Sequence, residues 1–307
     1  MTKSVFVGID LGGTNIRLAC SGEDGVFLSE DTFPTFCAEQ GKSFYDYLNG
    51  LIGSFVNSLS PEYDVKAICM GIPAIYFNGT LVANPNIRDF EPQRIINGFT
   101  SRGIPFYIYN DVKCAAVGEM WKGAARGTSD FIFVNTGTGV SMAAVAGGTL
   151  INGQNNASGE IAYWITEAGS TTGYADGRAP FEEQFSGRWI AEAMRGVLDE
   201  KNVTAKRVFE EYARGNLRVK AVLDRLLSNF ATVLANACIL LNPGMLVLGG
   251  GMAEALDLGY FDSYLKKVAP FPPVLVRSAL GGAAGLYGAV KLAIMNTGID
   301  NRECCRI

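Results

Sequence analysis

The sequence predicts a two-domain α/β protein in which one structural unit occurs twice. Two glycine-rich turns support this, since each follows an apolar run with the pattern of a buried strand. They lie in residues 4–15 (SVFVGIDLGGTN) and 131–145 (FIFVNTGTGVSMAAV). A chain of 307 residues is also long enough for two domains of ordinary size.

Strand and helix patterns alternate through the first half. In chain order, we expect strands at 4–10, 15–21 and 25–33, a helix at 43–59, a strand at 65–72, a hairpin-like segment at 76–85, a helix at 91–101, a strand at 105–109 and a helix at 112–123. Asn78-Gly79 is the expected turn of the hairpin-like segment, because this dipeptide accepts positive φ at both positions.

The second half repeats this order. We expect strands at 130–135, 139–146 and 148–151, a long helix at 217–241, a strand at 245–250, a helix opening near Met252, a strand at 273–278 and a final helix at 281–296. The repeat places the domain boundary near residue 110. The expected domains are therefore 1–110 and 111–284, with residues 285–307 folding back onto the first.

Composition and charge exclude several classes of protein. The net charge is −4, which leaves no basic stripe for nucleic acid, and no apolar run approaches the roughly 20 residues that span a bilayer. No basic, cleavable leader opens the chain, so we expect a cytoplasmic protein. The seven cysteines have no paired spacing, which is typical of reduced thiols; Cys304 and Cys305 are interpreted as tail residues. Since there is no histidine, acid–base chemistry must use other groups.

The first glycine turn has the residues of a phosphate site. A carboxylate at the end of a strand, two glycines and a hydroxyl can hold hydrated Mg²⁺ and wrap the terminal phosphates of a nucleotide. A plain hairpin turn explains the same residues equally well when they are considered alone. The candidate ligands are Asp10, Gly12, Gly13, Thr14 and Asn15.

Two further turns have the same character. The second presents backbone and hydroxyl donors without a competing charge. The third turn lies in LVLGGGM at 246–252 and follows a strand, and its N–H groups suit the adenosine and α-phosphate side. A tight strand-to-helix connection is the alternative for the third turn. The candidates are Thr136, Gly137, Thr138 and Gly139 in the second turn, and Gly249, Gly250 and Gly251 in the third.

Asp111 is the candidate general base. It follows an apolar strand and precedes a helical stretch, a junction where an aspartate often serves only as a helix cap. The functional alternative is that its carboxylate accepts a hydroxyl proton during phosphoryl transfer.

Taken together, these motifs resemble the ROK (repressor, ORF, kinase) family of sugar kinases, within the hexokinase–actin–Hsp70 ATPase superfamily. DLGGTNIR at 10–17 and NTGTGV at 135–140 look like its two phosphate motifs, and NPGMLVLGGGM at 242–252 looks like its adenosine motif. The resemblance implies a two-domain ribonuclease H-like (actin-like ATPase) fold with an active-site cleft between the domains. It also implies ATP and Mg²⁺ as cofactors and favours a homodimer.

Other segments resemble the sugar side of the family's site. NDVKCAAVGE at 110–119 resembles the segment with the catalytic aspartate, which carries that role onto Asp111. NPNI at 84–87, SGEIAYW at 158–164 and FEEQFSG at 181–187 resemble sugar-binding segments. The resemblance therefore implies that the sugar is bound by Asn86, Asn110, Asp111, Glu160, Tyr163 and Glu182.

The chain departs from the family pattern at its zinc site. Many members have a histidine where this chain has Tyr163, and three cysteines where residues 165–180 contain none. Zinc of that kind is therefore not expected. Tyr163 either replaces a hydrogen bond to the sugar, as in zinc-less β-glucoside kinases of the family, or packs on Trp164.

The expected activity is ATP-dependent phosphorylation of a hexose or hexose derivative at its 6-hydroxyl. Glucose, fructose, allose, N-acetylmannosamine and a β-glucoside all stay open as substrates. A non-catalytic sugar sensor or adaptor is the alternative, and a chaperone-like or actin-like ATPase is a third. Because the first expected strand begins at residue 4, we expect no DNA-binding module of the kind that family repressors carry.

Overall fold

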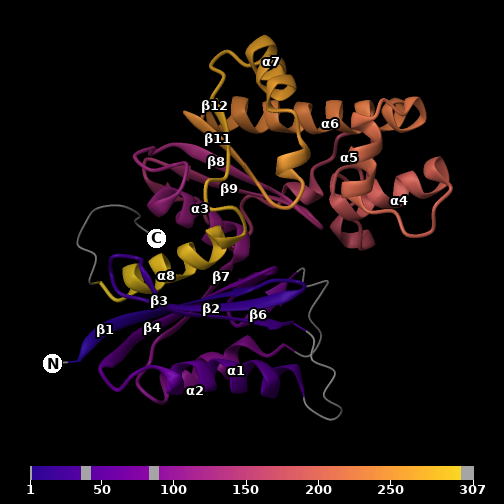
Figure 1. The fold of residues 1–307 in the computed structure, drawn as a ribbon. Coiled ribbons are helices and arrows are strands. Elements are labelled where there is room, and N and C mark those ends of the chain that lie inside the picture. Colours follow the sequence, from indigo (N-terminus) through magenta and orange to yellow (C-terminus); the bar gives the residue numbers. More distant parts are fainter. Residues whose placement is uncertain (1, 36–42, 83–89, 299–307) are drawn as a thin grey trace. The chain divides into compact units, whose positions relative to one another are not determined.

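A computed structural model describes residues 2–35, 43–82 and 90–298. The chain forms two compact units (Figure 1). Unit 1 contains Met1–Arg126, Asn152–Ala157 and Ala283–Ile307, and unit 2 contains Gly127–Ile151 and Ser158–Gly282.

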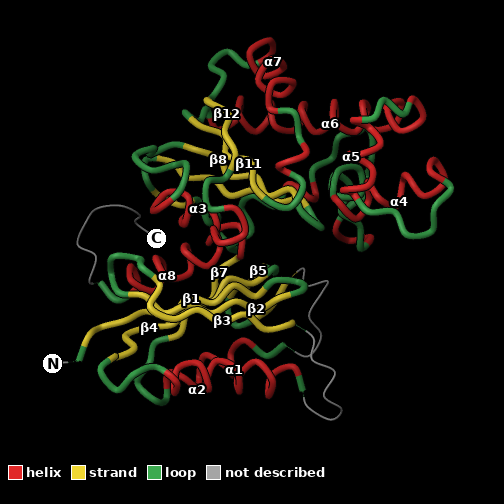
Figure 2. Tube along the Cα trace, viewed as in Figure 1, coloured by secondary structure: helices red, strands yellow, loops and turns green. Residues whose placement is uncertain are grey.

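Unit 1 is built on a five-stranded sheet in the order β3-β2-β1-β4-β7. Strands β1, β2 and β3 form an antiparallel meander, whereas β4 and β7 continue from β1 in parallel. Helices α1 and α2 cover one face of the sheet and α8 covers the other (Figure 2). The elements are β1 (Lys3–Leu11), β2 (Asn15–Ser21), β3 (Phe27–Pro34), α1 (Phe44–Ser58), β4 (Tyr63–Ile72), β5 (Ile75–Phe77), β6 (Thr80–Val82), α2 (Pro92–Thr100), β7 (Phe106–Asn110), α3 (Asp111–Lys122) and α8 (Ala284–Asn296).

Sequence signals explain the local structure of unit 1. Helix α1 begins after Ser43, whose hydroxyl oxygen accepts the Asp46 N–H at 3.1 Å. Its apolar residues then reach the core at helical spacing, through Leu48, Ile52 and Phe55. The β5–β6 turn has φ of 48° at Asn78 and 81° at Gly79, as the Asn-Gly dipeptide predicts.

Unit 2 repeats the arrangement with a sheet in the order β10-β9-β8-β11-β12. Its first three strands are again antiparallel, and β11 and β12 again continue in parallel. The duplicated unit predicted from the two glycine turns is therefore confirmed. The elements are β8 (Phe131–Thr136), β9 (Val140–Ala146), β10 (Thr149–Leu150), α4 (Gly187–Leu198), α5 (Ala205–Ala213), α6 (Leu217–Leu241), β11 (Met245–Gly249), α7 (Leu258–Val268) and β12 (Val274–Arg277).

Helix α6 has the length and composition of a membrane-spanning helix, but half of its most apolar stretch is buried in the unit. Its residues Leu223, Phe230 and Leu234 are buried in the unit 2 core. Phe230 stacks on Phe185 with ring centroids 4.1 Å apart. The expected helix near Met252 begins later, as α7, after a single 3₁₀ turn at Ala253–Ala255.

The contacts of α3 differ from the expected boundary at residue 110. Helix α3 belongs to unit 1, because glycines let it lie directly against α8. A Cβ atom at Gly288 would lie 1.6 Å from the Cys114 carbonyl oxygen, and one at Gly118 would lie 2.1 Å from that of Ala284. The first unit accordingly continues to Arg126 before the chain enters unit 2.

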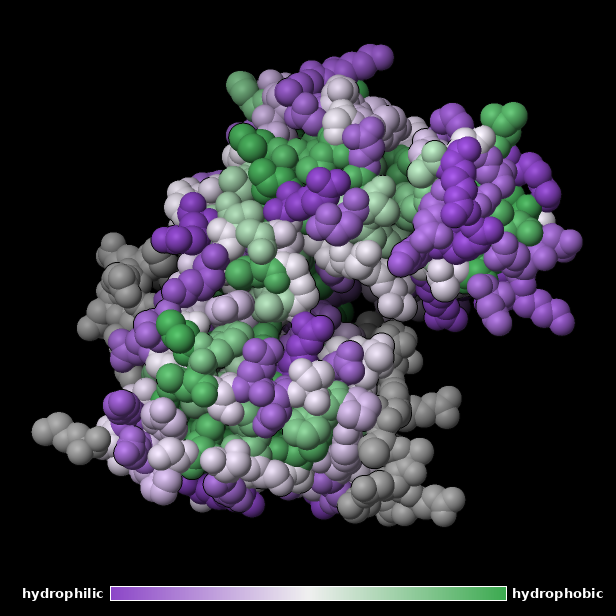
Figure 3. Space-filling model, in the orientation of Figure 1, coloured by the Kyte–Doolittle hydropathy of each residue, from purple (hydrophilic) through white to green (hydrophobic). Residues whose placement is uncertain are grey.

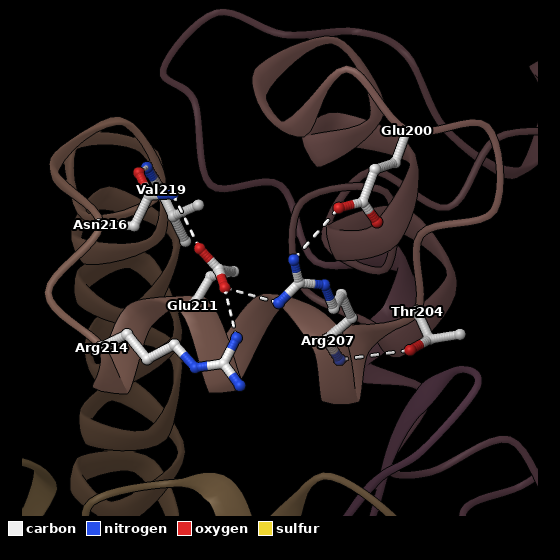
Figure 4. A network of polar contacts seen from close by, with 7 residues as sticks. All are labelled: Glu200, Thr204, Arg207, Glu211, Arg214, Asn216 and Val219. Carbon is white, nitrogen blue, oxygen red and sulfur yellow. Dashed lines mark hydrogen bonds and ion pairs between the residues drawn. The ribbon is translucent and has the colours of Figure 1, made fainter.

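A polar network centred on Glu211 joins the helices at one end of unit 2 (Figure 4). The Glu211 carboxylate accepts hydrogen bonds from Arg207 of α5 at 2.5 Å, from Arg214 at 2.7 Å, and from Asn216, the N-cap of α6, at 3.0 Å. Arg207 also pairs with Glu200 at 3.2 Å. These bonds lower the pKa of Glu211 to about 2, with the Asn216 hydrogen bond as the largest cause.

Glu211→Gln is expected to destabilise the protein at neutral pH but not in acid. Because the folded pKa lies below the ordinary value of 4.5, the stabilisation is complete above that value and is lost as the pH falls toward 2. Urea unfolding midpoints of wild type and variant should therefore differ at pH 7 and nearly converge at pH 2. Glu210→Gln, on the exposed face of the same helix, is the control. A gap between Glu211→Gln and wild type that is equal at both pH values would contradict the role of the charge.

Candidate functional site

Asp10 and Asp111 lie at the same edge of the unit 1 sheet. Asp10 is opposite Gly71 in the β1–β4 register, and Ile72 is opposite Asn110, the last residue of β7. Because parallel strands lie about 4.8 Å apart, the ends of β1 and β7 are separated by roughly 10 Å. The pKa of the buried Cys114 thiol is raised most by its hydrogen bond to Cys69 and by its burial. The charges of Asp111 and Asp10 raise it further, so both carboxylates act on the same thiol. Two carboxylates thus converge where β1, β4 and β7 end.

The Asp10 carboxylate lies against the beginning of helix α8. A Cβ atom at Gly285 would be only 3.2 Å from Asp10 Oδ1, so a glycine gives the carboxylate room at the positive end of the helix dipole. The residue keeps some exposure, but burial of its carboxylate raises the pKa to about 6, and Arg17 offsets part of this effect. A buried charge of this kind is a natural ligand for a cation.

The first glycine turn connects β1 to β2 directly after Asp10. The Gly12 N–H donates to the Asn15 carbonyl at 3.0 Å, which closes the turn. Thr35 fastens it from the end of β3, since its hydroxyl donates to the Gly12 carbonyl at 2.6 Å and its N–H to the Thr14 carbonyl at 2.9 Å. Gly13, Thr14 and Asn15 are exposed, as a phosphate-binding turn requires.

Asn110, rather than Asp111, is the N-cap of α3. The Asn110 side-chain oxygen accepts the N–H groups of Val112 at 3.0 Å and Lys113 at 3.3 Å. Asp111 is the first helical residue, and its Oδ1 accepts the Val112 N–H at 2.8 Å. The interpretation of Asp111 as the cap is therefore wrong, and the helix assigns that role to its neighbour.

Asp10→Asn is expected to change how stability depends on pH. Because the folded pKa of about 6 lies above the unfolded value near 3.9, the folded state holds its proton more tightly. The wild-type unfolding free energy, measured without metal, should fall by about 2 kcal/mol as the pH rises from 4 to 7, because of this group alone. Urea titrations should show that Asp10→Asn loses this component. Equal slopes for the two proteins would show that Asp10 is not perturbed.

The second and third glycine turns pack together in unit 2. Gly250 has φ of +88°, and a Cβ atom there would lie 2.5 Å from the Thr136 carbonyl oxygen. The Met252 N–H donates to the same carbonyl at 2.9 Å. The buried Thr136 hydroxyl donates to the Gly249 carbonyl at 3.0 Å. Thr136 thus joins the two turns, a role that the sequence did not predict.

Helix α4 and Glu182 hold the second turn from the other side. The N–H groups of Gly187 and Arg188 donate to the carbonyls of Gly137 at 2.8 Å and Thr138 at 3.4 Å. The Glu182 carboxylate accepts the Val140 N–H at 3.2 Å, and a Cβ atom at Gly139 would lie 2.5 Å from its Oε2. Burial raises the pKa of Glu182. Glu182, expected on the sugar side, is therefore in contact with the phosphate turn.

Glu160 is placed by an unusual backbone at Gly159. Gly159 has φ of +89°, and a Cβ atom there would lie 2.0 Å from the Met142 carbonyl oxygen in β9. The Met142 N–H donates to the Gly159 carbonyl at 3.0 Å, and Glu160 then opens the 3₁₀ turn Ile161–Tyr163. Only glycine fits this close approach, so Gly159 fixes the backbone position from which Glu160 follows.

Tyr163 lies near both candidate sugar carboxylates. Burial is the largest cause that raises the pKa of its hydroxyl. The charge of Glu160 raises this pKa further, and the charge of Glu182 does so more weakly. Its ring meets the edge of Tyr174, with centroids 5.6 Å apart. Tyr174 belongs to the loop at 165–180, which Arg178 holds by pairing with Glu183, with Nε donating to Oε1 at 2.7 Å. The charges of Glu160 and Glu182 thus both act on the Tyr163 hydroxyl.

The remaining expectations concern Asn86 and metal binding. Asn86 lies outside the described residues. Within residues 2–35, 43–82 and 90–298, no three cysteine, aspartate or glutamate side chains are grouped to hold a metal ion. Reasoning from sequence missed Thr35, Lys113, Tyr174 and Gly285, of which only Lys113 carried a signal, as a lysine within an apolar helix.

Comparison with known proteins decides the family. The model of the ROK family matches residues 6–296. The chain belongs to the ROK family. Its relatives include the glucokinase of Halalkalibacterium halodurans, 29% identical with 94% of each chain covered. An N-acetylmannosamine kinase of Escherichia coli is 25% identical, with 94% of this chain and 98% of the relative covered.

Solved structures show the same fold. The ROK hexokinase of Thermus thermophilus superposes with a TM-score of 0.79 at 24% identity, over 96% of this chain and 99% of that one. The ROK glucokinase of Streptomyces griseus, in complex with glucose and AMPPNP, gives 0.71 at 23% identity, over 95% and 99%. This ROK protein therefore has the actin-like ATPase fold, as its motifs predicted.

Proposed function

We propose that this ROK protein transfers the γ-phosphoryl group of ATP to the 6-hydroxyl of a hexose or hexose derivative. The observation that carries the proposal is the convergence of Asp10 and Asp111 at the sheet edge beside the first glycine turn. Its relatives include glucokinases and N-acetylmannosamine kinases, and an AMPPNP complex of a family glucokinase supports ATP as the donor.

In the proposed mechanism, Asp111 accepts the proton of the attacking hydroxyl. Asp111 is not needed as the helix cap, because the side chain of Asn110 already accepts the first N–H groups of α3. Backbone donors of the glycine turns at 12–15, 136–139 and 249–251 neutralise charge on the phosphates. Asp10 would hold Mg²⁺, which fits its buried carboxylate and raised pKa. Magnesium would supply further neutralisation of the transferred group.

The residues proposed to hold the sugar are Asn86, Asn110, Glu160, Tyr163 and Glu182, as the resemblance to the family implies. Support comes from the charges of Glu160 and Glu182, which both perturb the Tyr163 hydroxyl. For Glu182 we also propose a second role, since its carboxylate holds the Val140 N–H next to the phosphate turn.

ADP release with a panel of sugars tests the proposal. Glucose, fructose, allose, N-acetylmannosamine and a β-glucoside should be offered with ATP and Mg²⁺, and EDTA should abolish turnover that Mg²⁺ restores. We expect turnover with at least one of them. Sugar binding without turnover would favour a non-catalytic sensor. ATP hydrolysis without sugar dependence would favour a chaperone-like or actin-like ATPase.

Tyr163→Phe is expected to raise the KM of one sugar more than that of others. Loss of one neutral hydrogen bond corresponds to about 0.5–1.5 kcal/mol, and the hydroxyl would contact one particular substituent. Steady-state kinetics over the panel measure the effect. Since the phenyl ring keeps the contact with Tyr174, packing is conserved. An equal KM for both proteins with every sugar would show that Tyr163 only packs.

We also propose a cytoplasmic homodimer. Support comes from large exposed apolar side chains at one end of the unit 2 sheet, where α6 ends and β12 begins; these are Ile239, Leu240, Phe271 and Val274. Val274 pairs in register with Met245, which follows α6 closely, so these residues lie in one region. Figure 3 shows apolar surface on unit 2 among hydrophilic residues. Sedimentation equilibrium of wild type and Phe271→Ser tests the dimer.

A further inference from the structure

Lys113 is a buried lysine next to the proposed general base. It stands two residues after Asp111 in the first turn of α3, and only 3% of its surface is exposed. Burial disfavours a charged ammonium, and the positive end of a helix dipole disfavours it further. Its neighbours Val112, Cys114 and Ala116 are buried too, so an apolar side chain would suit the fold better.

The ammonium group of Lys113 is directed to a segment distant in sequence. Its Nζ donates to the carbonyls of Asn152 at 3.2 Å and Asn156 at 2.8 Å, among its contacts. A second link holds the same segment, since Asn156 Nδ2 donates to the Tyr76 carbonyl at 3.1 Å. Asn156 has φ of +57°, in the left-handed region of backbone conformation. This residue uses its carbonyl for the bond to Lys113 and its side chain for the bond to Tyr76.

The fastened segment interrupts unit 2. Residues Asn152–Ala157 belong to unit 1, although the chain on both sides of them belongs to unit 2. Glu160 follows Asn156 by four residues, a span that can reach at most about 14 Å. The intervening Gly159 is itself pinned to Met142. Asn156 and Gly159 therefore restrict Glu160 together, since the span from Asn156 limits its reach and the contact with Met142 fixes the backbone directly before it.

We propose that Lys113 is a positioning residue for sugar binding. Its ammonium group fastens residues 152–156 to the unit that carries Asp111, and thereby restricts Glu160. The inference rests on the proposed function, because Glu160 is a proposed sugar ligand. A carbonyl pair accepts charge-assisted hydrogen bonds, which are stronger than neutral ones and suit a tether of this kind.

Lys113→Met tests the proposal, since methionine keeps an unbranched side chain and removes the charge. We expect faster amide hydrogen exchange in residues 152–157 and a rise of about tenfold or more in the sugar KM, with the KM for ATP changed less than about twofold. Lys122→Met, on the exposed end of the same helix, is the matched control and should leave all three unchanged. Unaltered exchange and sugar KM in Lys113→Met would overturn the proposal, as would equal rises in both KM values.

Asn156→Gly keeps the test valid if Lys113→Met does not fold. Asn156 is exposed, and glycine accepts its positive φ, so this variant should fold while losing the bond to Tyr76. A smaller rise in exchange and in sugar KM supports the proposal, and wild-type values for both overturn it. If wild type phosphorylates no sugar, the proposed function fails, whereas exchange in these variants still reports whether the segment is fastened.

Discussion

Asp111→Asn is expected to lower kcat by about 10²–10⁴-fold, the usual contribution of a general base. The amide has the shape of the carboxylate but cannot accept the proton of the attacking hydroxyl. Folding should be retained, because Asn110 caps α3 and the oxygen of the introduced amide can still accept the Val112 N–H. The KM for the sugar should change little. Steady-state kinetics with the best sugar of the panel provide the measurement.

Asn110→Ala separates catalysis from helix capping. Loss of this N-cap should lower the unfolding free energy by about 1 kcal/mol, which Asp111→Asn should not do. Comparing thermal midpoints of the two variants therefore distinguishes the two roles. If Asp111→Asn keeps more than about half of the wild-type kcat, Asp111 is not the base, and another group must take the proton.

The sheets and turns were predictable because their signals are local. Apolar runs ending at glycine gave β1 and β8, and Asn78-Gly79 gave a turn whose φ values match the dipeptide. The repeated strand order follows from the same pattern in each half. The last helix was predicted at 281–296 and lies at Ala284–Asn296, but its close approach to Cys114 through Gly288 was not predicted.

The parts that could not be predicted depend on contacts distant in sequence. Periodicity could not place Glu182 against Gly139, because 42 residues separate Glu182 from the Val140 N–H that it binds. Similarly, the Thr136 hydroxyl could have faced a ligand, but it bonds to Gly249 across 113 residues. The boundary at residue 110 was misplaced because the packing of α3 on α8 joins segments far apart in the chain.

Glu160→Gln is expected to raise the sugar KM by roughly 10- to 150-fold. The change replaces a charged acceptor by a neutral amide, and hydrogen bonds to charged groups are worth about 1.5–3 kcal/mol. Gly159 fixes the backbone at this position through its approach to Met142, so the glutamine should occupy the same place. Because the interaction is made in the ground state as well, kcat should fall less than kcat/KM.

The control and the stability measurement decide between a sugar ligand and a structural charge. Glu167→Gln removes an exposed carboxylate from the following loop and should leave the sugar KM unchanged. If Glu160 served only the fold, Glu160→Gln would lower the thermal midpoint while the folded enzyme kept its KM. The charge of Glu160 also raises the pKa of Tyr163, so its removal should shift that hydroxyl toward its ordinary pKa. A shifted Tyr163 with an unchanged sugar KM would mean that the carboxylate lies beside the tyrosine but does not touch the sugar.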